Sequence, residues 1–381
     1  MQKKEPMRIL HVVTHLRRGG IAEFLMNVYR RIDRTKIQFD FVKHTDYKEA
    51  HDIEISHLGG RVFTLPSHTG KNHFQYISAW RFLFQNHPEY RIVHGHNAMA
   101  CFYLTIAKKY GCVTIMHSHA TAFAPSFRGF VKHFLRYCVR ARADYLFACS
   151  KKAGEFYFGK DAFRRYKYNV IRNTIDVQAF AYNRVIREKK RTELDIQEQL
   201  VLGHVGGYSY HKNHRFLIEI FAEVRRIRPD AMLILVGDGY LMEDIKRKVE
   251  HMGLSASVMF LSERPDVPDL LQSMDIFVFP SVHEGLPVAV IEAQAAGLPC
   301  IISDVISEEA HATKLIKAIS LRCSVRVWAS QIISHYESIE RYDMSGIMKL
   351  AGYDVGRSVE WLTRFYEDTY VLTKRTGDGV R

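Results

Sequence analysis

Two acidic residues spaced eight positions apart stand out in the second half of the sequence. Glu284 lies in the segment Pro-Ser-Val-His-Glu-Gly-Leu-Pro at 280–287, and Glu292 falls in the apolar helical pattern that follows. Backbone N–H groups at a helix start favour an anionic ligand, and Gly285 lets such a ligand approach the chain closely. The segment indicates a site for an anion with hydroxyl groups that Glu284 can bind. A solvated loop acid followed by a salt-bridged helix acid is the alternative.

Two further loops with suitable chemistry lie between an expected strand and an expected helix. Lys212 belongs to the segment Gly-Gly-Tyr-Ser-Tyr-His-Lys-Asn-His at 206–214, where its ammonium could reach a phosphate or could be solvated. Gly19-Gly20 follows the first expected strand but lacks the GxGxxG spacing of a dinucleotide site. The Gly237-Asp238-Gly239 sequence is typical of a turn.

Two His-x-His pairs, His94 with His96 and His117 with His119, end expected strands. Alternate residues of a strand share a face, so each pair could offer two ligands to a metal ion. No carboxylate or third histidine follows at short spacing. We therefore predict no metal site and expect polar strand ends that line a ligand cleft.

A basic stretch with interleaved aromatic residues lies between residues 128 and 142. Its cations recur at helical spacing, at Arg128, Lys132, Arg136 and Arg140. Such a pattern is typical of an amphipathic helix that meets anionic lipid head groups, and a solvated basic face is the alternative. The sequence holds no zinc finger, RNP or helix-turn-helix pattern, so we expect no nucleic-acid partner.

The elements that carry these loops follow from alternating β-rich and helical patterns. Strands are expected at 8–13, 37–42, 61–65, 92–94, 113–117 and 145–149. The alternation lapses over the charge-rich residues 183–199 and restarts with strands at 200–205, 231–236, 258–261, 276–279 and 299–302. The pattern predicts an α/β fold with two doubly wound parallel sheets. We expect domains at 1–180 and 200–353, a linker at 181–199, and loops that face each other across a cleft.

Composition narrows the class of protein. The 381 residues include 54 Lys+Arg and 41 Asp+Glu, a formal charge of +13. Residues 1–180 hold 29 basic and 13 acidic residues, a surplus of 16, whereas the remainder holds 25 and 28. No apolar run approaches the ~20 residues that cross a bilayer, and the N-terminal segment lacks a signal-peptide core. We expect a cytoplasmic protein, and the six cysteines, with no CxxC pair, read mostly as buried thiols.

In combination, the motifs resemble those of retaining glycosyltransferases of family 4, which have the GT-B fold. Among these the chain looks most like bacterial exopolysaccharide or capsule glycosyltransferases of the EpsF-like kind. The resemblance covers the whole chain. It rests above all on Glu284-Gly285-Leu286-Pro287 with Glu292, which matches the family's E-x7-E motif, and on Arg-Arg-Gly-Gly at 17–20, Lys-Asn-His at 212–214 and Arg-Asn-Thr-Ile-Asp at 172–176. It also implies that a C-terminal helix at 354–381 packs back on the N-terminal domain.

The family implies a nucleotide-diphosphate sugar as donor, and a UDP-sugar is expected. Glu284 would then hold hydroxyls of the donor sugar, Glu292 would hold the ribose hydroxyls, and Arg264 would lie near the base. The backbone that would meet the sugar and the diphosphate is that of Gly285, Leu286, Pro287 and Val288, with Gly20 approaching from the other domain.

The same resemblance implies the catalytic residues and the partners. Lys212 would neutralise the departing diphosphate, and His117 would lie beside the reacting sugar together with Glu284. The family needs no metal, because cationic side chains and a helix N-terminus stabilise the charge. The expected acceptor is a glycan or a lipid-linked oligosaccharide, which the protein would meet at the anionic inner face of the membrane.

Three positions depart from the family pattern. Relatives usually read V-G-R-F or V-A-R-F where this chain has Val-Gly-Gly-Tyr at 205–208, so a phosphate-binding cation is missing at Gly207. Relatives often place an acid at the position of Ala22, whereas this chain has Glu23, and the common N-G-I-D reads Asn-Thr-Ile-Asp at 173–176. We hypothesise that Gly207 weakens donor binding, or that His211 or an arginine replaces the cation.

Other classes of function stay open at this point. Another GT-B enzyme, such as a nucleotide-sugar epimerase, shares the fold but lacks the E-x7-E arrangement. A degenerate transferase of low activity, or a non-catalytic protein that binds anions or nucleic acid, would explain the charge but would leave Glu284 and Glu292 without a role.

Overall fold

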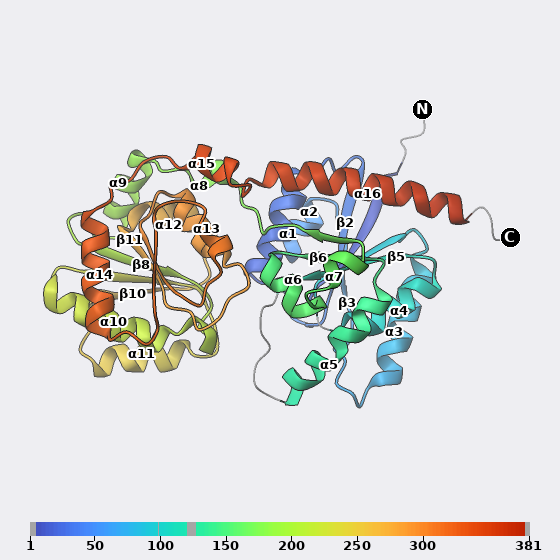
Figure 1. The fold of residues 1–381 in the computed structure, drawn as a ribbon, viewed down its shortest axis with the longest axis horizontal. Coiled ribbons are helices and arrows are strands. Elements are labelled where there is room, and N and C mark those ends of the chain that lie inside the picture. The colour runs from blue at the N-terminus through green and yellow to red at the C-terminus, as the bar shows by residue number, and fades with distance from the viewer. Residues whose placement is uncertain (1–4, 98, 120–126, 378–381) are drawn as a thin grey trace. The chain divides into compact units, whose positions relative to one another are not determined.

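The fold is taken from a computed structural model, which describes residues 5–97, 99–119 and 127–377, without the side chains of 127–134 and 374–377. The chain forms two compact units (Figure 1). Unit 1 consists of Met1–Asn173 with Val355–Arg381, and unit 2 consists of Thr174–Asp354. Among the described residues, no helix combines the length and apolar composition that crossing a membrane requires.

Unit 1 is built on a seven-stranded parallel sheet in the order β3-β2-β1-β4-β5-β6-β7. Its strands are β1 (Met7–Val12), β2 (Ile37–Lys43), β3 (Val62–Thr64), β4 (Ile92–Gly95), β5 (Val113–Ser118), β6 (Tyr145–Ala148) and β7 (Tyr168–Val170). The central strands are apolar along most of their length because helices cover both faces of the sheet (Figure 1).

The helices of unit 1 connect successive strands. They are α1 (Gly20–Arg31), α2 (Asp52–His57), α3 (His73–Asn86), α4 (Ala100–Lys109), α5 (Phe127–Arg142), α6 (Lys151–Phe158) and α7 (Ala162–Arg165). Helix α1 shows the usual reason for packing: Phe24, Leu25 and Val28 lie on one side and are buried in the core.

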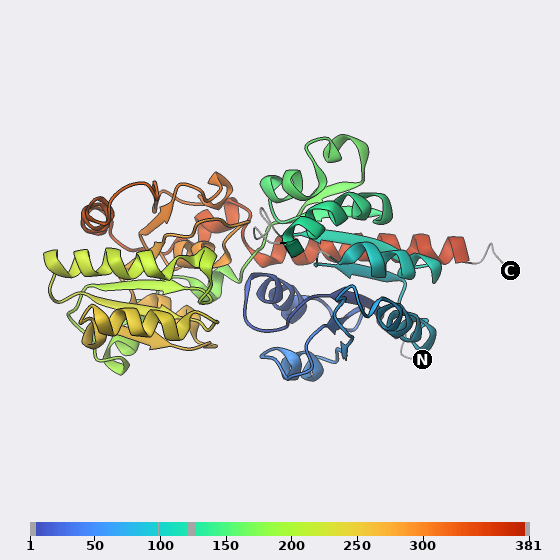
Figure 2. The ribbon, with the colours of Figure 1, turned by 90° about the horizontal axis from the view of Figure 1, so that it is seen from below.

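The C-terminal helix α16 (Val355–Gly377) also belongs to unit 1. It packs against α1 and β4, and both views show it along this unit (Figures 1 and 2). Its apolar stripe places Val355, Leu362 and Tyr366 in the unit 1 core. The Tyr366 hydroxyl lies 2.8 Å from Nδ1 of His94 on β4.

Unit 2 repeats the architecture with six parallel strands in the order β10-β9-β8-β11-β12-β13. The strands are β8 (Val201–Val205), β9 (Met232–Val236), β10 (Val258–Leu261), β11 (Ile276–Phe279), β12 (Cys300–Ser303) and β13 (Ile316–Ile319). The helices are α8 (Val177–Phe180), α9 (Arg184–Glu193), α10 (His214–Ile227), α11 (Met242–His251), α12 (Val267–Ser273), α13 (Val288–Ala295), α14 (Val325–Glu337) and α15 (Ser345–Leu350). The two doubly wound sheets expected from the sequence are thus confirmed.

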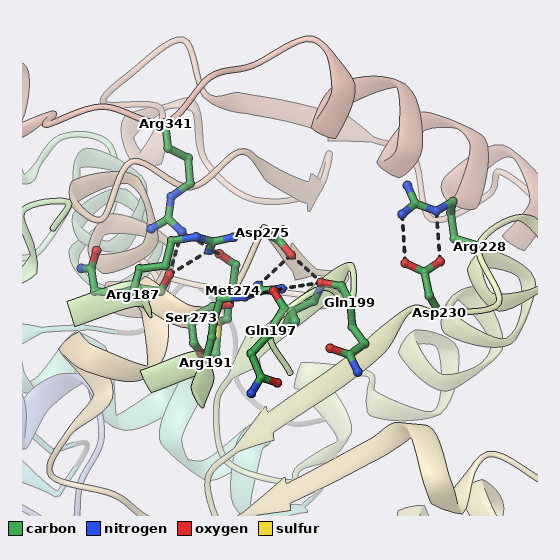
Figure 3. A network of polar contacts seen from close by, with 12 residues as sticks. Arg187, Arg191, Gln197, Gln199, Arg228, Asp230, Ser273, Met274, Asp275 and Arg341 are labelled. Carbon is green, nitrogen blue, oxygen red and sulfur yellow. Dashed lines mark hydrogen bonds and ion pairs between the residues drawn. The ribbon is translucent and has the colours of Figure 1, made fainter. Parts of the chain in front are cut away.

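The residues expected as a linker at 181–199 instead include helix α9, which packs on α12 inside unit 2. Ion pairs, rather than apolar burial, hold the polar helix α9 in place. Arg187 and Arg191 both donate to the Asp275 carboxylate, at 2.5 and 3.1 Å. Arg341 donates to the carbonyls of Met274 and three other residues of the same region (Figure 3).

Candidate donor-binding site

The loops of interest in unit 2 leave neighbouring strands where the strand order reverses. Strand β8 is followed by the loop that holds Lys212, and β11 by the loop that holds Glu284. These two strands lie side by side in the sheet, although their helices lead away from each other in strand order. A reversal of this kind opens a crevice at the carboxyl ends of the strands, which is where open α/β sheets bind ligands.

The two loops meet through a charged contact. Lys212 donates from Nζ to Oε1 of Glu284 over 2.7 Å, and the two side chains are 15% and 12% exposed. The ammonium also lies 4.5 Å from the centre of the Phe279 ring, at the end of β11. A half-desolvated cation of this kind interacts more strongly with an anion than a solvated one does.

Backbone contacts hold the loops in register. The Val282 N–H donates to the carbonyl of His211 over 2.8 Å, and the Asn213 amide donates to the carbonyl of Pro280 over 3.1 Å. Asn213 has a left-handed backbone with φ of 57° and begins α10 directly after Lys212. Asparagine tolerates this conformation better than most residues, so the turn that aims Lys212 is encoded locally.

The Gly237-Asp238-Gly239 turn supports the first of these loops. The N–H of Tyr208 donates to the carbonyl of Asp238 over 3.0 Å. A Cβ atom on Gly237, where φ is 141°, would lie 2.4 Å from the carbonyl oxygen of Gly206. A side chain cannot fit there, so the glycine allows the loops after β8 and β9 to touch.

His211 directly precedes Lys212 and lies four positions after Gly207, where the family cation is missing. Its Nδ1 is 3.1 Å from Oγ of Ser209, and its ring centre is 5.4 Å from that of His283. Burial lowers the pKa of His211, the neighbouring Lys212 lowers it further, and the Glu284 carboxylate opposes both effects. An anionic ligand at this site would raise the same pKa.

The predicted residues of the loop after β11 lead into helix α13. Gly285 is partly exposed, Leu286, Pro287 and Val288 are buried, and Glu292 is partly exposed one turn into the helix. The N-cap residue is Pro287, and no described side chain caps the helix. The first turn of α13 therefore leaves backbone donors for a ligand or water.

Arg264 lies further along the same sheet edge. It belongs to the loop after β10, and β10 is two strands away from β8. Its guanidinium makes two bonds of 2.7 Å to Asp266, which also contacts Lys190 at 3.2 Å. These cations lower the pKa of Asp266 to about 2. Arg264 is thus paired within unit 2, and only part of its donor capacity remains for a ligand.

In unit 1, the predicted Gly20 is the first residue of α1 and follows β1 at that unit's own reversal of strand order. Glu23 lies within 3.4 Å of Arg18 and 3.2 Å of the buried His51. The buried Ala22 packs in the core. The acid that is displaced by one position relative to the family pattern therefore ties the Gly19-Gly20 loop to its neighbours.

The predicted His117 is fully buried at the end of β5. Neither of its ring nitrogens has a hydrogen-bond partner among the described residues. Its ring lies on that of His119 at 4.1 Å and on that of His94 at 5.4 Å. Burial holds its pKa well below the ordinary value, so the imidazole is neutral.

Sequence reasoning missed that the two His-x-His pairs belong to one cluster with His11 on β1. Strand pairing places His11 opposite His94. Two triads, His11/His94/His96 and His96/His117/His119, each have ring nitrogens within 4.8 Å of one another. The recurrence of histidine at the ends of adjacent strands was the available signal, but the order of strands was needed to use it.

In the basic helix α5, two of the four predicted surface cations make contacts with the neighbouring helix α6. Arg136 donates to the carbonyl of Phe156, and Arg140 donates to the carbonyl of Phe158 over 2.7 Å. Both guanidiniums therefore tie α5 to α6 inside unit 1, and their role at a membrane surface stays a prediction. The side chains of Arg128 and Lys132 lie outside the described residues.

The arrangement defines a class of protein. Residues 18–179 match the family described as Glycosyltransferase Family 4, and residues 186–315 match the family described as Glycosyl transferases group 1. The chain belongs to the family 4-like glycosyltransferases with the GT-B fold, as its sequence motifs led us to expect. It is a transferase of the sugar-transferring class.

Individual known proteins are similar to this chain. The chain is 33% identical to the putative glycosyltransferase EpsF of Bacillus subtilis, over 94% of this chain and 96% of that one. It is 30% identical to an Escherichia coli UDP-Gal:alpha-D-GlcNAc-diphosphoundecaprenol alpha-1,3-galactosyltransferase, over 57% and 58%. The crystal structure of Anabaena HepE in complex with UDP-glucose has a similar fold, with a TM-score of 0.78 at 18% identity over 95% of this chain and all of that one.

Proposed function

We propose that this chain transfers a hexose or N-acetylhexosamine from a UDP-sugar, with retention of anomeric configuration, to a polysaccharide or lipid-linked oligosaccharide. The observation that carries the proposal is the contact between Lys212 and Glu284 where β8 and β11 end side by side. It brings together a cation for a diphosphate and a carboxylate for sugar hydroxyls.

In the proposed reaction, the bond between the anomeric carbon and the diphosphate oxygen breaks. The acceptor hydroxyl oxygen forms the new bond on the same face, and its proton passes to the departing diphosphate. Lys212 stabilises the charge that develops on this leaving group, as an electrostatic catalyst does. Donor hydroxyls replace Lys212 as the partners of Glu284. The charge is stabilised without a metal ion.

The names of the relatives support the donor and the acceptor class. HepE was crystallised with UDP-glucose, and the E. coli relative is named for transfer from UDP-Gal to a diphosphoundecaprenol-linked sugar. EpsF, which is similar along nearly the whole chain, supports a role in exopolysaccharide synthesis. A capsule polysaccharide is chemically the same kind of product as an exopolysaccharide, so the proposal includes capsule synthesis.

We further propose that unit 1 meets an anionic membrane surface from the cytoplasmic side. Because Arg136 and Arg140 are bonded to α6, helix α3 supports membrane contact better than the described side chains of α5 do. Phe74 and Phe82 lie on α3 at 89% and 67% exposure, with Arg81 exposed between them. Exposed aromatic residues beside a cation are typical of an interfacial helix. Residues 1–180 also carry the positive surplus of 16.

The test is a panel of nucleotide sugars with mass-spectrometric detection of transfer or slow hydrolysis, in buffer containing EDTA. We expect turnover of one UDP-sugar, loss of turnover in Glu284→Ala, and weakened donor binding in Glu292→Ala. An epimerised donor would identify another GT-B enzyme. Absence of any turnover would indicate a binding protein. A fully active Glu292→Ala variant with unchanged donor affinity would refute the role of Glu292.

A further inference from the structure

Three histidines of unit 1, the buried His11 and His96 and the partly buried His119, form a continuous chain of hydrogen bonds. Nδ1 of His11 lies 3.1 Å from Nε2 of His96, and Nδ1 of His96 lies 3.1 Å from Nε2 of His119. Nδ1 of His119 lies 3.2 Å from Oδ1 of Asn173. Each step is within the range of a protein hydrogen bond.

The rings meet edge to edge rather than face to face. The centres of His11 and His96 are 5.4 Å apart, as are those of His96 and His119. By contrast, the stacked rings of His117 and His119 are 4.1 Å apart. A centre separation of 5.4 Å with nitrogens at 3.1 Å places the N–H···N line along the two rings, which is the favourable direction for both donor and lone pair.

The direction of the chain follows from its last member. The Asn173 amide is oriented with Oδ1 toward His119, and in this orientation Oδ1 accepts and His119 carries its proton on Nδ1. A neutral imidazole has one donor and one acceptor, so Nε2 of His119 accepts from Nδ1 of His96, and Nε2 of His96 accepts from Nδ1 of His11. All three rings are therefore Nδ1–H tautomers, with the unpaired buried Nε2 of His11 as the terminal acceptor.

The chain ends at a point where the polypeptide leaves unit 1. Asn173 is the last residue of the first segment of unit 1, and Thr174 begins unit 2. Asn173 is buried. Two residues later, the N–H of Ile175 donates to the carbonyl of Tyr353 over 2.9 Å, just before the chain returns at Val355. The chain of imidazoles thus ends on the last residue of unit 1 before the polypeptide enters unit 2.

We propose that His11, His96 and His119 are positioning residues: as a one-directional chain of neutral imidazoles, they hold the Asn173 side chain and the segment that follows it in the orientation needed for glycosyl transfer. The effect on the reaction rests on the proposed function. The chain of tautomers does not, and it can be tested on the protein without any substrate.

A metal ion is the competing interpretation of the same histidines. Ligand rings converge edge-on upon an ion with their lone pairs free. Here both nitrogens of His96 take part in ring-to-ring hydrogen bonds. The neighbouring pairs His94/His96 and His117/His119 are stacked at 4.4 and 4.1 Å, so their lone pairs run side by side rather than to one point. The geometry favours the hydrogen-bonded chain.

The first experiment is NMR of the full chain with 15N-labelled imidazole rings, which distinguishes Nδ1–H from Nε2–H tautomers. We expect three neutral Nδ1–H rings in the wild type. In His96→Leu the His11 ring loses the acceptor of its Nδ1–H, so its signals should shift, whereas His119 keeps Nδ1–H through Asn173. His96→Gln keeps one donor and one acceptor and should preserve the signals of His11 and His119. Nε2–H tautomers at these positions in the wild type, or an unchanged His11 signal in His96→Leu, would overturn the proposal. So would stoichiometric Zn²⁺ binding that His96→Leu abolishes.

The second experiment measures transfer by the same variants, with folding checked by thermal unfolding. We expect His96→Leu to lower kcat at least tenfold while the Kd for UDP stays unchanged, and His96→Gln to recover most of kcat. His251→Gln, on the exposed end of α11, is the matched control. Equal kcat in His96→Leu and wild type would overturn the positioning role. If the wild type transfers no sugar, the proposed function fails while the NMR result still decides the chain.

Discussion

Lys212 and Glu284 are 72 positions apart in sequence and 2.7 Å apart in space, and they form an ion pair between the two donor loops. In the ligand-free state the pair neutralises itself. We expect Lys212→Met to lower kcat/KM by roughly 10- to 150-fold, because a charge-assisted contact of about 1.5–3 kcal/mol is lost. Steady-state kinetics check this. Lys246→Met, which breaks an exposed pair with Glu243 in the same unit, should leave kcat/KM unchanged.

The missing cation at Gly207 gives a second prediction. A Cβ atom there would meet only the Asp238 carbonyl oxygen, at 3.1 Å, so a larger side chain needs a small backbone adjustment. We expect Gly207→Arg to tighten donor binding in calorimetry. His211→Ala should weaken binding in the wild type and weaken it less in the Gly207→Arg background. No gain from the arginine, or a loss, would show that nothing is missing at this position.

The arginine cluster around Asp275 should matter for stability. Asp275 accepts from Arg187, from Arg191 and from the N–H of Val201, and these groups are mostly buried. We expect Asp275→Asn to lower the free energy of unfolding by about 3–5 kcal/mol, because buried cations lose their counter-charge.

An ion pair at the surface of unit 2 provides the control for the Asp275 prediction. Arg228 and Asp230 form a two-bond pair at the surface of unit 2 (Figure 3). Asp230→Asn should cost less than about 1 kcal/mol in the same urea titration. Equal losses in the two variants would mean that burial does not distinguish these pairs.

The buried histidines predict how stability depends on pH. Burial lowers the pKa of His11 to about 3 and those of His119 and His204 to about 4. Above pH 6.5 neither the folded nor the unfolded state binds a proton at these rings. Below it the unfolded state does first, so stability falls with acid by about 1.4 kcal/mol per pH unit for each group. Thermal unfolding between pH 7 and 5 checks the direction. A melting temperature that rises as the pH is lowered from 7 to 5 would contradict the prediction.

Membrane binding gives a last prediction. We expect the double substitution Phe74→Ser and Phe82→Ser to reduce sedimentation with vesicles that contain anionic lipid, while turnover of a soluble donor is retained. Leu350, on α15 of unit 2, is 87% exposed and provides the control Leu350→Ser. Equal sedimentation of the two variants would place the contact elsewhere.

Sequence reasoning located best the strands whose apolar runs have sharp ends. Strands β10 and β11 begin and end at the expected residues, because Ser257 and Ser262 bound the first run and Asp275 and Pro280 bound the second. Edge strands β7 and β13 were missed, since they are short and half-exposed. Helix α9 was taken for a linker because ion pairs of Arg187 and Arg191, rather than an apolar stripe, fix it.

Parts of the candidate site could be predicted from local sequence, and other parts depend on how distant elements pack. The loops with Lys212 and Glu284 could be expected to meet, since strand-to-helix loops share one sheet edge. The contact of His11 with His96 depends on β1 pairing with β4, a strand distant in sequence, in addition to its neighbour β2. The contacts of the Arg136 and Arg140 side chains depend on how α5 packs against α6. Neither could be derived from local spacing.

Helix α16 completes a unit that began about 350 residues earlier, because Leu362 and Tyr366 fill the core of unit 1 while residues 174–354 form unit 2 without interruption. During synthesis on the ribosome, unit 2 is therefore the first to possess all of its parts. Unit 1 must wait for the last helix to emerge, with the apolar surface beneath α16 open until then. A chaperone that recognises nascent chains would find that surface late in translation, and a released chain that ends before Leu362 would hold all residues of unit 2 but lack the core residues that α16 supplies to unit 1.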